Sequence, residues 1–122
     1  MDKYTNISYE ICEQFTKEYS TSFSMSSQLF DKSIRQHIYA IYGFARIGDE
    51  IVDTYRQKDA DDQLNQLETQ TYGAMKSGYS VNPILHAFAN TANKYLIDEK
   101  LIKPFFNSMR TDLTVKSFNK KE

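Results

Sequence analysis

Four polar side chains in the middle of this chain recur at the spacing of one face of an α-helix. In chain order they are Tyr42, Arg46, Asp49 and Asp53. Their separations of four, three and four residues return to nearly the same side of a helix. The rest of the stretch 39–53 is largely apolar, and charged groups are costly to bury without partners. We therefore expect this face to bind a charged ligand.

Asp49 and Asp53 are the pair that suits a metal ion. Two carboxylates four residues apart on an exposed helix repel each other by a few tenths of a kcal/mol. Mg²⁺ relieves such repulsion, because it prefers oxygen ligands and commonly links one or two carboxylates to substrate phosphates. Arg46 lies one turn earlier, where its guanidinium can bind phosphate oxygens, and Tyr42 adds a hydroxyl. The pattern suits a diphosphate bound through Mg²⁺, with Asp49 and Asp53 as the metal ligands.

An internal salt-bridge cluster is the alternative interpretation of the same stretch. Arg46 precedes Asp49 by three residues and Glu50 by four, and helical side chains meet at both spacings. The neighbouring Phe44 and Ile47 are not typical of an exposed helix face. Spacing by itself favours neither interpretation, and both stay open at this point.

Length and composition describe a single domain of balanced charge. The chain has 122 residues with 15 basic and 16 acidic side chains, so nothing favours nucleic acid as a partner. Cys12 is the single cysteine, which excludes an internal disulfide and fits a reducing compartment. The first residues lack a signal-peptide core, and no apolar run reaches the length of a membrane span. We expect a cytoplasmic protein, with peripheral membrane contact left open.

Hydrophobic periodicity predicts an all-α chain that forms a single unit over residues 1–122. The first helix is expected over 7–19, with Asn6 as its N-cap and an apolar stripe as its core face. That stripe consists of Ile7, Ile11, Phe15 and Tyr19. The serine-rich segment 20–27 favours a break or a short, loosely helical piece. The second helix is expected over 31–55 and carries the four polar side chains.

Stop and start signals delimit three further helices. The acidic segment 59–62 is interpreted as a linker and the start of the third helix, which ends near Gly78. Residues 82–83, Asn-Pro, predict the start of the fourth. Residues 103–104, Lys-Pro, predict the start of a fifth helix of about ten residues, followed by a frayed tail over 115–122.

Two motifs resemble one known family in their order and spacing. Residues 20–23 read Ser-Thr-Ser-Phe, and residues 41–53 read Ile-Tyr-Gly-Phe-Ala-Arg-Ile-Gly-Asp-Glu-Ile-Val-Asp. Together they resemble the first conserved region of the squalene and phytoene synthases, which join two prenyl diphosphates head to head. Weaker similarity follows at residues 82–83 and 109–113, so the resemblance covers nearly all of the chain.

The resemblance implies a fold, a reaction and a set of site residues. The fold would be a helical bundle that forms part of the isoprenoid synthase fold. The enzyme would be a prenyltransferase of carotenoid or isoprenoid biosynthesis that condenses two geranylgeranyl or farnesyl diphosphates with Mg²⁺ as cofactor. Asp49 and Asp53 would bind the metal, and Asp112 would face the same cavity. The implied catalytic residues are Tyr42, Arg46, Asp49 and Asp53, and those implied to contact the diphosphate are Ser20, Ser22, Tyr42 and Arg46.

Two departures from the family pattern limit what the chain alone is expected to do. Glu50 stands where the family usually has a second aspartate. The family's second Asp-x-x-x-Asp motif is not found, since the acids at 59–62 belong to a linker and those at 98–99 to a helix end. We therefore expect this chain to be the N-terminal part of such an enzyme, inactive by itself.

Two non-enzymatic alternatives are weighed against this interpretation. A helical module of the same fold that has lost the chemistry would serve as a binding or assembly protein. An incomplete bundle would expose apolar faces and self-associate as a homo-oligomer. The intact polar face favours the enzyme, whereas the missing second motif favours the binding module.

Overall fold

The computed structural model describes the backbone of residues 1–55 and 57–121, with side-chain environments as far as residue 115. The structure is 83% helical, and the residues it describes contain no strand. The all-α class expected from the sequence is therefore confirmed. In chain order the elements are α1 (Lys3–Tyr19), α2 (Thr21–Ser27), α3 (Lys32–Asp49), the π-helix η1 (Glu50–Tyr55), α4 (Ala60–Ser77), α5 (Pro83–Lys94) and α6 (Glu99–Lys121).

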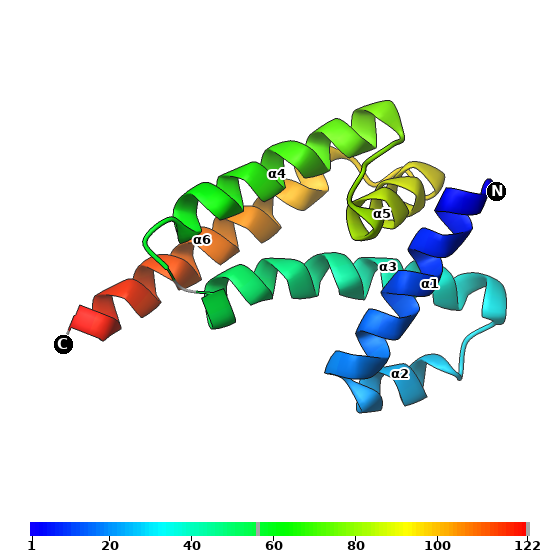
Figure 1. The fold of residues 1–122 in the computed structure, drawn as a ribbon, viewed down its shortest axis with the longest axis horizontal. Coiled ribbons are helices and arrows are strands. Elements are labelled where there is room, and N and C mark those ends of the chain that lie inside the picture. Colours follow the sequence, from blue (N-terminus) through cyan, green and yellow to red (C-terminus); the bar gives the residue numbers. More distant parts are fainter. Residues whose placement is uncertain (56, 122) are drawn as a thin grey trace.

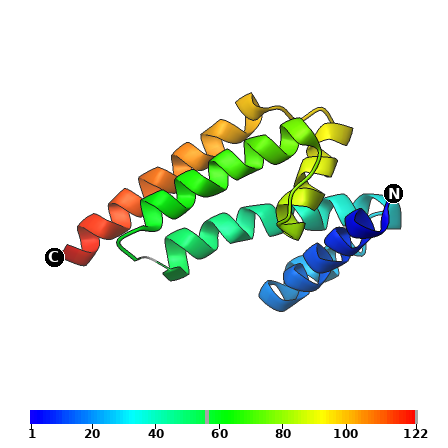
Figure 2. The same cartoon turned by 45° about the horizontal axis from the view of Figure 1, so that its top comes forward.

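The central helix is α3, and the other helices divide between its two ends (Figure 1). α1 and α2 lie together at the N-terminal end of α3, while α4 and α6 run side by side toward the other end (Figures 1 and 2). α5 contacts α1, α3 and α4 and so joins the two groups. Every helix in the described part of the chain is too short or too polar to span a bilayer.

The first helix begins earlier than the sequence predicts. α1 starts at Lys3 rather than at residue 7, and the Asp2 carboxylate accepts a hydrogen bond from the Thr5 N–H at 2.7 Å. Asp2, not Asn6, is therefore the N-cap. The additional turn is anchored from a distance, because the Tyr4 hydroxyl donates to a backbone carbonyl of residue 80 at 2.6 Å. This long-range contact has no local signal at the start of the chain.

The face that α1 buries is polar, and the predicted apolar stripe is wrong. Ile7 and Ile11 are 39% and 38% exposed, so they are not core residues. The side chains that α1 buries are Thr5, Ser8, Tyr9, Cys12 and Thr16. Periodicity of apolar residues misleads here because most core-facing positions carry hydroxyl groups, and those of Thr5 and Tyr9 have hydrogen-bond partners on other helices.

Five side chains, called the polar seam below, supply most of those partners. They are Thr5, Tyr9, His37, His86 and Thr91, from α1, α3 and α5. Thr5 Oγ1 lies 2.8 Å from His86 Nε2. The Thr91 hydroxyl lies 2.8 Å from the Tyr9 hydroxyl and 2.9 Å from His37 Nδ1. Buried polar groups need such partners, and these bonds allow a polar interface inside the fold.

The serine-rich segment and the second predicted helix both form. The Ser20 hydroxyl accepts a hydrogen bond from the Phe23 N–H at 3.1 Å and caps the short helix α2. α3 begins directly after Asp31, as predicted, and helical backbone continues to Tyr55. Its continuation η1 has π-helical rather than α-helical hydrogen bonding, which the periodicity of the sequence does not indicate.

The predicted end of α4 and the predicted start of α5 are confirmed. α4 ends before Gly78, which adopts a left-handed conformation with φ of 78°. Glycine takes this conformation without the steric penalty of a Cβ atom. The Asn82 side chain accepts hydrogen bonds from the N–H groups of Ile84 and Leu85 at 3.0 and 3.2 Å, and Pro83 is the first residue of α5.

The last helix is longer than predicted. α6 begins at Glu99 and runs for 23 residues with Pro104 inside it, so the predicted start at residues 103–104 is wrong. The Asp98 carboxylate accepts a hydrogen bond from the Lys100 N–H at 2.9 Å and marks the true start. Pro104 is the sixth residue of α6, so it removes a backbone donor inside the helix, and α6 nevertheless continues beyond it. The predicted frayed tail falls mostly on residues whose side chains lie outside the described part, and it stays a prediction.

An apolar core holds α3, α4, α5 and α6 together. Its centre, called the aromatic cluster below, consists of Phe44, Phe88, Phe105 and Phe106. Phe44 and Phe88 stack with their ring centroids 3.9 Å apart and 11° between the ring planes. Phe106 is fully buried and meets Phe44 edge to face at 5.8 Å. This cluster lies beside the C-terminal half of α3, which carries the polar face.

Candidate functional site

The four predicted site residues lie along the C-terminal part of α3 and in η1. Tyr42, Arg46 and Asp49 are half-buried, and Asp53 is exposed in the π-helix. A π-helix has a wider turn than an α-helix, so the α-helical spacing that predicts one straight stripe does not apply beyond Asp49. Single-turn π segments are rare and are frequent at functional sites. The irregular backbone therefore coincides with the second carboxylate of the predicted metal pair.

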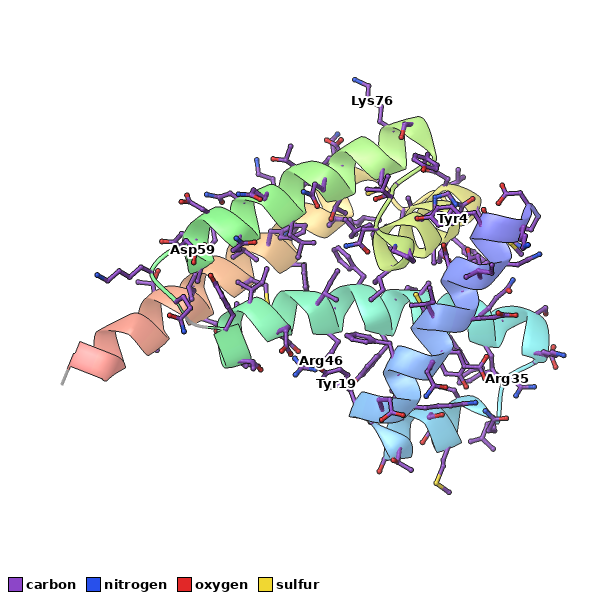
Figure 3. All side chains as sticks on the ribbon, in the orientation of Figure 1. Tyr4, Tyr19, Arg35, Arg46, Asp59 and Lys76 are labelled. Carbon is purple, nitrogen blue, oxygen red and sulfur yellow. The ribbon has the colours of Figure 1, made fainter. Side chains whose placement is uncertain are left out.

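Arg46 has partners on two other segments. Its Nη2 lies 3.0 Å from the Glu50 Oε2, an ion pair across one helical turn. The Tyr19 ring lies against the guanidinium, with the Arg46 Cζ 4.3 Å from the ring centroid. Figure 3 shows the labelled side chains of Tyr19 and Arg46 next to each other between α1 and α3. The Arg46–Glu50 part of the salt-bridge alternative is thus present, and Tyr19 is a contact that the sequence did not suggest.

Tyr42 links the serine motif to the polar face. The Phe23 ring stacks on the Tyr42 ring with centroids 4.9 Å apart and 28° between the planes. This contact brings α2, and with it the segment that carries Ser20 and Ser22, against α3. Ser22 is exposed, whereas the Ser20 hydroxyl serves as the cap of α2. Two motifs separated in sequence therefore meet in the structure through the Phe23–Tyr42 stack, whereas contact of Ser20 and Ser22 with a diphosphate stays a prediction.

A second polar link holds α2 in this place. The Gln28 side chain accepts a hydrogen bond from Arg35 Nη1 at 2.5 Å and donates one to the Tyr39 hydroxyl at 3.1 Å. Tyr39 is buried in α3, so the end of α2 is attached to a fixed point. Sequence reasoning missed these residues because glutamine, arginine and tyrosine at such separations carry no motif.

An apolar groove of about 410 Å³ opens beside Arg46. Its lining residues are Phe15, Tyr19, Ile47, Glu50, Ile51, Tyr55 and Gln63. The Glu50 carboxylate stands at its polar side, and the remaining walls come mainly from aromatic and aliphatic side chains. Phe15 and Tyr19 belong to the stripe that was predicted as core, so the aromatic residues of that stripe face a groove rather than the interior.

α6 approaches the polar face next to Asp49. A Cβ atom built at Gly48 would lie 3.0 Å from the Phe105 Cζ and 3.6 Å from the Met109 Sδ. The absence of a side chain at Gly48 therefore lets α6 pack directly on the backbone that precedes Asp49. Asp112 is exposed and follows Met109 by three residues, which puts it on the same side of α6. That Asp112 faces the diphosphate cavity stays a prediction.

The donor set for a metal ion is incomplete in the described residues. No group of three or more histidine, cysteine or acidic side chains in this part of the chain is arranged to hold a cation. Asp49 and Asp53 offer two carboxylates, and further ligands would have to be water or substrate oxygens. Mg²⁺ is commonly bound in this way, through one or two carboxylates and substrate phosphates. The residues present therefore fit a metal shared with a diphosphate, and not a metal held by this chain alone.

Known proteins resemble this chain in sequence. Residues 16–122 match the sequence model of the family described as squalene/phytoene synthase. A phytoene synthase of Arthrospira platensis is 29% identical over 113 residues, which cover 92% of this chain and 36% of the relative. A 4,4'-diapophytoene synthase of Staphylococcus haemolyticus is 27% identical over 108 residues, covering 85% and 37%. The chloroplastic phytoene synthase 2 of Zea mays is 29% identical over 110 residues, covering 86% and 26%. The chain thus spans 26% to 37% of the length of these curated relatives.

Proposed function

The chain belongs to the squalene/phytoene synthase family, and we propose that it forms one wall of the diphosphate-binding site of a Mg²⁺-dependent prenyltransferase. Its all-α structure agrees with the isoprenoid synthase fold. The proposed reaction of the whole enzyme is the head-to-head condensation of two geranylgeranyl or farnesyl diphosphates. The observation that carries the proposal is that Arg46 and Asp49 are both half-buried on α3, with Asp49 four residues before Asp53, and that the Arg46 partners Tyr19 and Glu50 line an apolar groove.

Each polar side chain has a proposed part in binding the diphosphate. Asp49 and Asp53 hold Mg²⁺, which when bound offsets the negative charge that develops on the departing diphosphate. Arg46 donates hydrogen bonds to phosphate oxygens, and guanidinium groups are suited to this by their planar array of donors. Hydroxyl groups add further donors to the same oxygens. These hydroxyls belong to Tyr42, Ser20 and Ser22, and the Phe23–Tyr42 stack supports their proximity.

The apolar groove is the proposed contact for the hydrocarbon part of the substrate. Aromatic faces such as those of Phe15 and Tyr19 attract cationic carbon centres. Apolar walls also keep water away from a reactive cation. The adjacency of a charged face and an aromatic groove therefore matches a substrate with a diphosphate head and a long apolar tail.

We expect the 122-residue chain alone to bind Mg²⁺ and diphosphate weakly and to form no product. Its described residues supply one pair of carboxylates where the family chemistry uses two. Incubation with farnesyl diphosphate and Mg²⁺, followed by extraction and chromatography, should return only unreacted substrate and its hydrolysis product. Formation of a head-to-head product by this chain would contradict this part of the proposal.

Calorimetric titration with inorganic pyrophosphate and Mg²⁺ tests the binding site. The Asp49→Asn/Asp53→Asn variant should bind at least about tenfold more weakly than the wild type, which corresponds to about 1.4 kcal/mol. The matched control is Asp61→Asn/Asp62→Asn, which removes the same charge from exposed positions in the first turn of α4. Its affinity should stay within about twofold of the wild type. Equal affinities of the wild type and the Asp49/Asp53 variant would refute the proposed site.

A further inference from the structure

Arg46 is held by two residues that line the apolar groove and are not among the proposed diphosphate ligands. Glu50 pairs with its Nη2 at 3.0 Å, and the Tyr19 ring covers the guanidinium at 4.3 Å from Cζ. The Tyr19 hydroxyl also lies 3.5 Å from the Glu50 Oε2, a long and weak hydrogen bond that closes the triangle. Three segments, α1, α3 and η1, thus meet at one guanidinium.

The carboxylate of Glu50 occupies an acceptor position that a phosphate oxygen would also use. Guanidinium groups bind carboxylates and phosphates with the same donors and similar geometry. A donor that is paired with Glu50 is therefore not available to a diphosphate until the pair opens. The Arg46 side chain is 19% exposed and that of Glu50 is 39% exposed. Glu50 is the partner with more room to move into solvent.

Unlike Glu50, Tyr19 contacts the Arg46 guanidinium through its ring and does not occupy a hydrogen-bond donor. A cation over an aromatic ring is attracted by the face of the ring and keeps its in-plane donors available. Tyr19 can therefore keep Arg46 in position whether or not Glu50 is paired with it. Tyr19 also directly precedes Ser20, the cap of α2, so the same residue borders the serine segment.

We propose that Glu50 is an internal competitor for the anion ligand of Arg46, and that Tyr19 is the platform that holds the guanidinium when Glu50 is displaced. Both are positioning residues, since neither needs to touch the diphosphate. This inference rests on the proposed function, because it assigns Arg46 to diphosphate oxygens. In the opposite arrangement Glu50 would be a third metal ligand and would favour binding.

The effect of Glu50→Gln separates these two roles when it is measured with and without Mg²⁺, because loss of a metal ligand would weaken binding only in the presence of Mg²⁺. Partly exposed ion pairs change equilibrium constants by about two- to fivefold. Glu50→Gln should therefore bind inorganic pyrophosphate about two- to fivefold more tightly than the wild type in metal-free buffer. A nuclear magnetic resonance titration that follows the Arg46 side-chain N–H signals measures this affinity. Unchanged or weaker metal-free binding by Glu50→Gln would overturn the competitor role.

Glu13→Gln is the matched control for the lost charge. Glu13 pairs with Lys17 at 2.8 Å across one turn of α1, with side-chain exposures of 44% and 48%. The variant changes the net charge by the same amount and breaks the same kind of ion pair. Its metal-free affinity for pyrophosphate should equal that of the wild type. A gain as large as that of Glu50→Gln would assign the effect to net charge and overturn the competitor role.

Substitutions of Tyr19 test the platform. In the Glu50→Gln background, Tyr19→Phe keeps an aromatic face and should retain the tighter binding, whereas Tyr19→Leu should lose it. Tyr19 is largely exposed, and a circular dichroism spectrum checks that both variants remain folded. The side-chain signals of Arg46 should also lose their ring-current shift in Tyr19→Leu. Retention of the tighter binding by Tyr19→Leu would overturn the platform role.

The outcomes distinguish this inference from the proposed function. Loss of Mg²⁺-dependent binding in Asp49→Asn/Asp53→Asn, with no gain in Glu50→Gln, supports the site and refutes the competitor. A metal-free gain in Glu50→Gln, with no Mg²⁺-dependent loss in the Asp49/Asp53 variant, supports the competitor and refutes the metal pair. Absence of pyrophosphate binding under both conditions refutes both.

Discussion

The two halves of α3 are stabilised by different kinds of interaction. Its C-terminal half packs in the aromatic cluster, where Phe44 stacks on Phe88 at 3.9 Å. Its N-terminal half joins the polar seam, where His37 and Thr91 are 2.9 Å apart. Apolar burial depends on area and shape, whereas hydrogen bonds between buried side chains depend on direction and on complete pairing. The C-terminal half of α3 is therefore positioned by the shape of its apolar contacts, and the N-terminal half by the direction of its hydrogen bonds.

This difference matters for the candidate site because α3 carries it. The aromatic cluster brings α6 against Gly48, next to Asp49. The seam attaches α1, whose last residue Tyr19 reaches Arg46. The acid pair and the arginine thus depend on different ends of the fold. Substitutions in the two regions should have distinguishable effects, and the following predictions test this from the largest effect to the smallest.

Removal of a central ring should have the largest effect. Phe106 is fully buried in the aromatic cluster, and Phe106→Ala should lower the free energy of unfolding by about 3–5 kcal/mol. Urea denaturation followed by circular dichroism measures the loss. Phe30→Ala is the control, because Phe30 is 52% exposed and its loss should stay within about 0.5 kcal/mol. A loss below about 2 kcal/mol for Phe106→Ala would mean that the cluster is not the main apolar support.

Removal of one hydroxyl from the seam should have an intermediate effect. Thr91→Val keeps the volume but leaves Tyr9 and His37 without their shared short hydrogen-bond partner. We expect a loss of about 1–3 kcal/mol in the free energy of unfolding, by the same urea measurement. The control is Thr111→Val, an exposed threonine whose hydroxyl donates only to a carbonyl of its own helix. Equal stabilities of the two variants would show that the seam does not depend on its hydrogen bonds.

A change of pH from about 7.5 to 5.5 should act on the seam through His37 and have the smallest effect. Burial, with a further contribution from Lys94, lowers the pKa of His37 below its ordinary value of 6.5. The folded state therefore resists the proton that the unfolded chain accepts. The stability that His37 contributes is fully present above pH 6.5 and is lost as the pH decreases through 6.5 toward the lowered pKa of the folded state. His37→Gln should reduce the pH dependence of the free energy of unfolding between about pH 7.5 and 5.5. If the free energy of unfolding of this variant depends on pH as it does in the wild type, His37 is not the source of the pH dependence.

Local signals predicted the elements that local interactions determine. Gly78 ends α4 and Asn82 caps α5 because backbone conformation and side-chain capping act within a few residues. α3 also begins directly after Asp31, although the Asp31 side chain forms no capping hydrogen bond. The polar face was also found from local spacing, since it lies on a single helix. The resemblance to the family implied roles for these residues that spacing left undecided, and those roles stay predictions.

The errors concern contacts between distant segments. Ile7 and Ile11 look like a core stripe, yet α1 buries its hydroxyl face because Thr91 and the two histidines of the seam supply partners from α3 and α5. The start of α6 was misplaced because a Lys-Pro pair resembles a helix start, whereas Ile102 and Phe106, on either side of Pro104, are both buried in the apolar core. Neither the buried face of α1 nor the start of α6 can be predicted from the residues of one helix alone.

The sequence by itself determined the chemistry that this chain offers: an arginine, two carboxylates and a tyrosine at helical spacing, with a serine motif upstream. Tertiary structure alone decided how that chemistry is held. It placed Phe23 on Tyr42, turned the segment of Asp53 into a π-helix, and set Arg46 between Tyr19 and Glu50. The physical reason is that residue types and spacing act along one helix, whereas the partner of a charged group is chosen by which helices pack together.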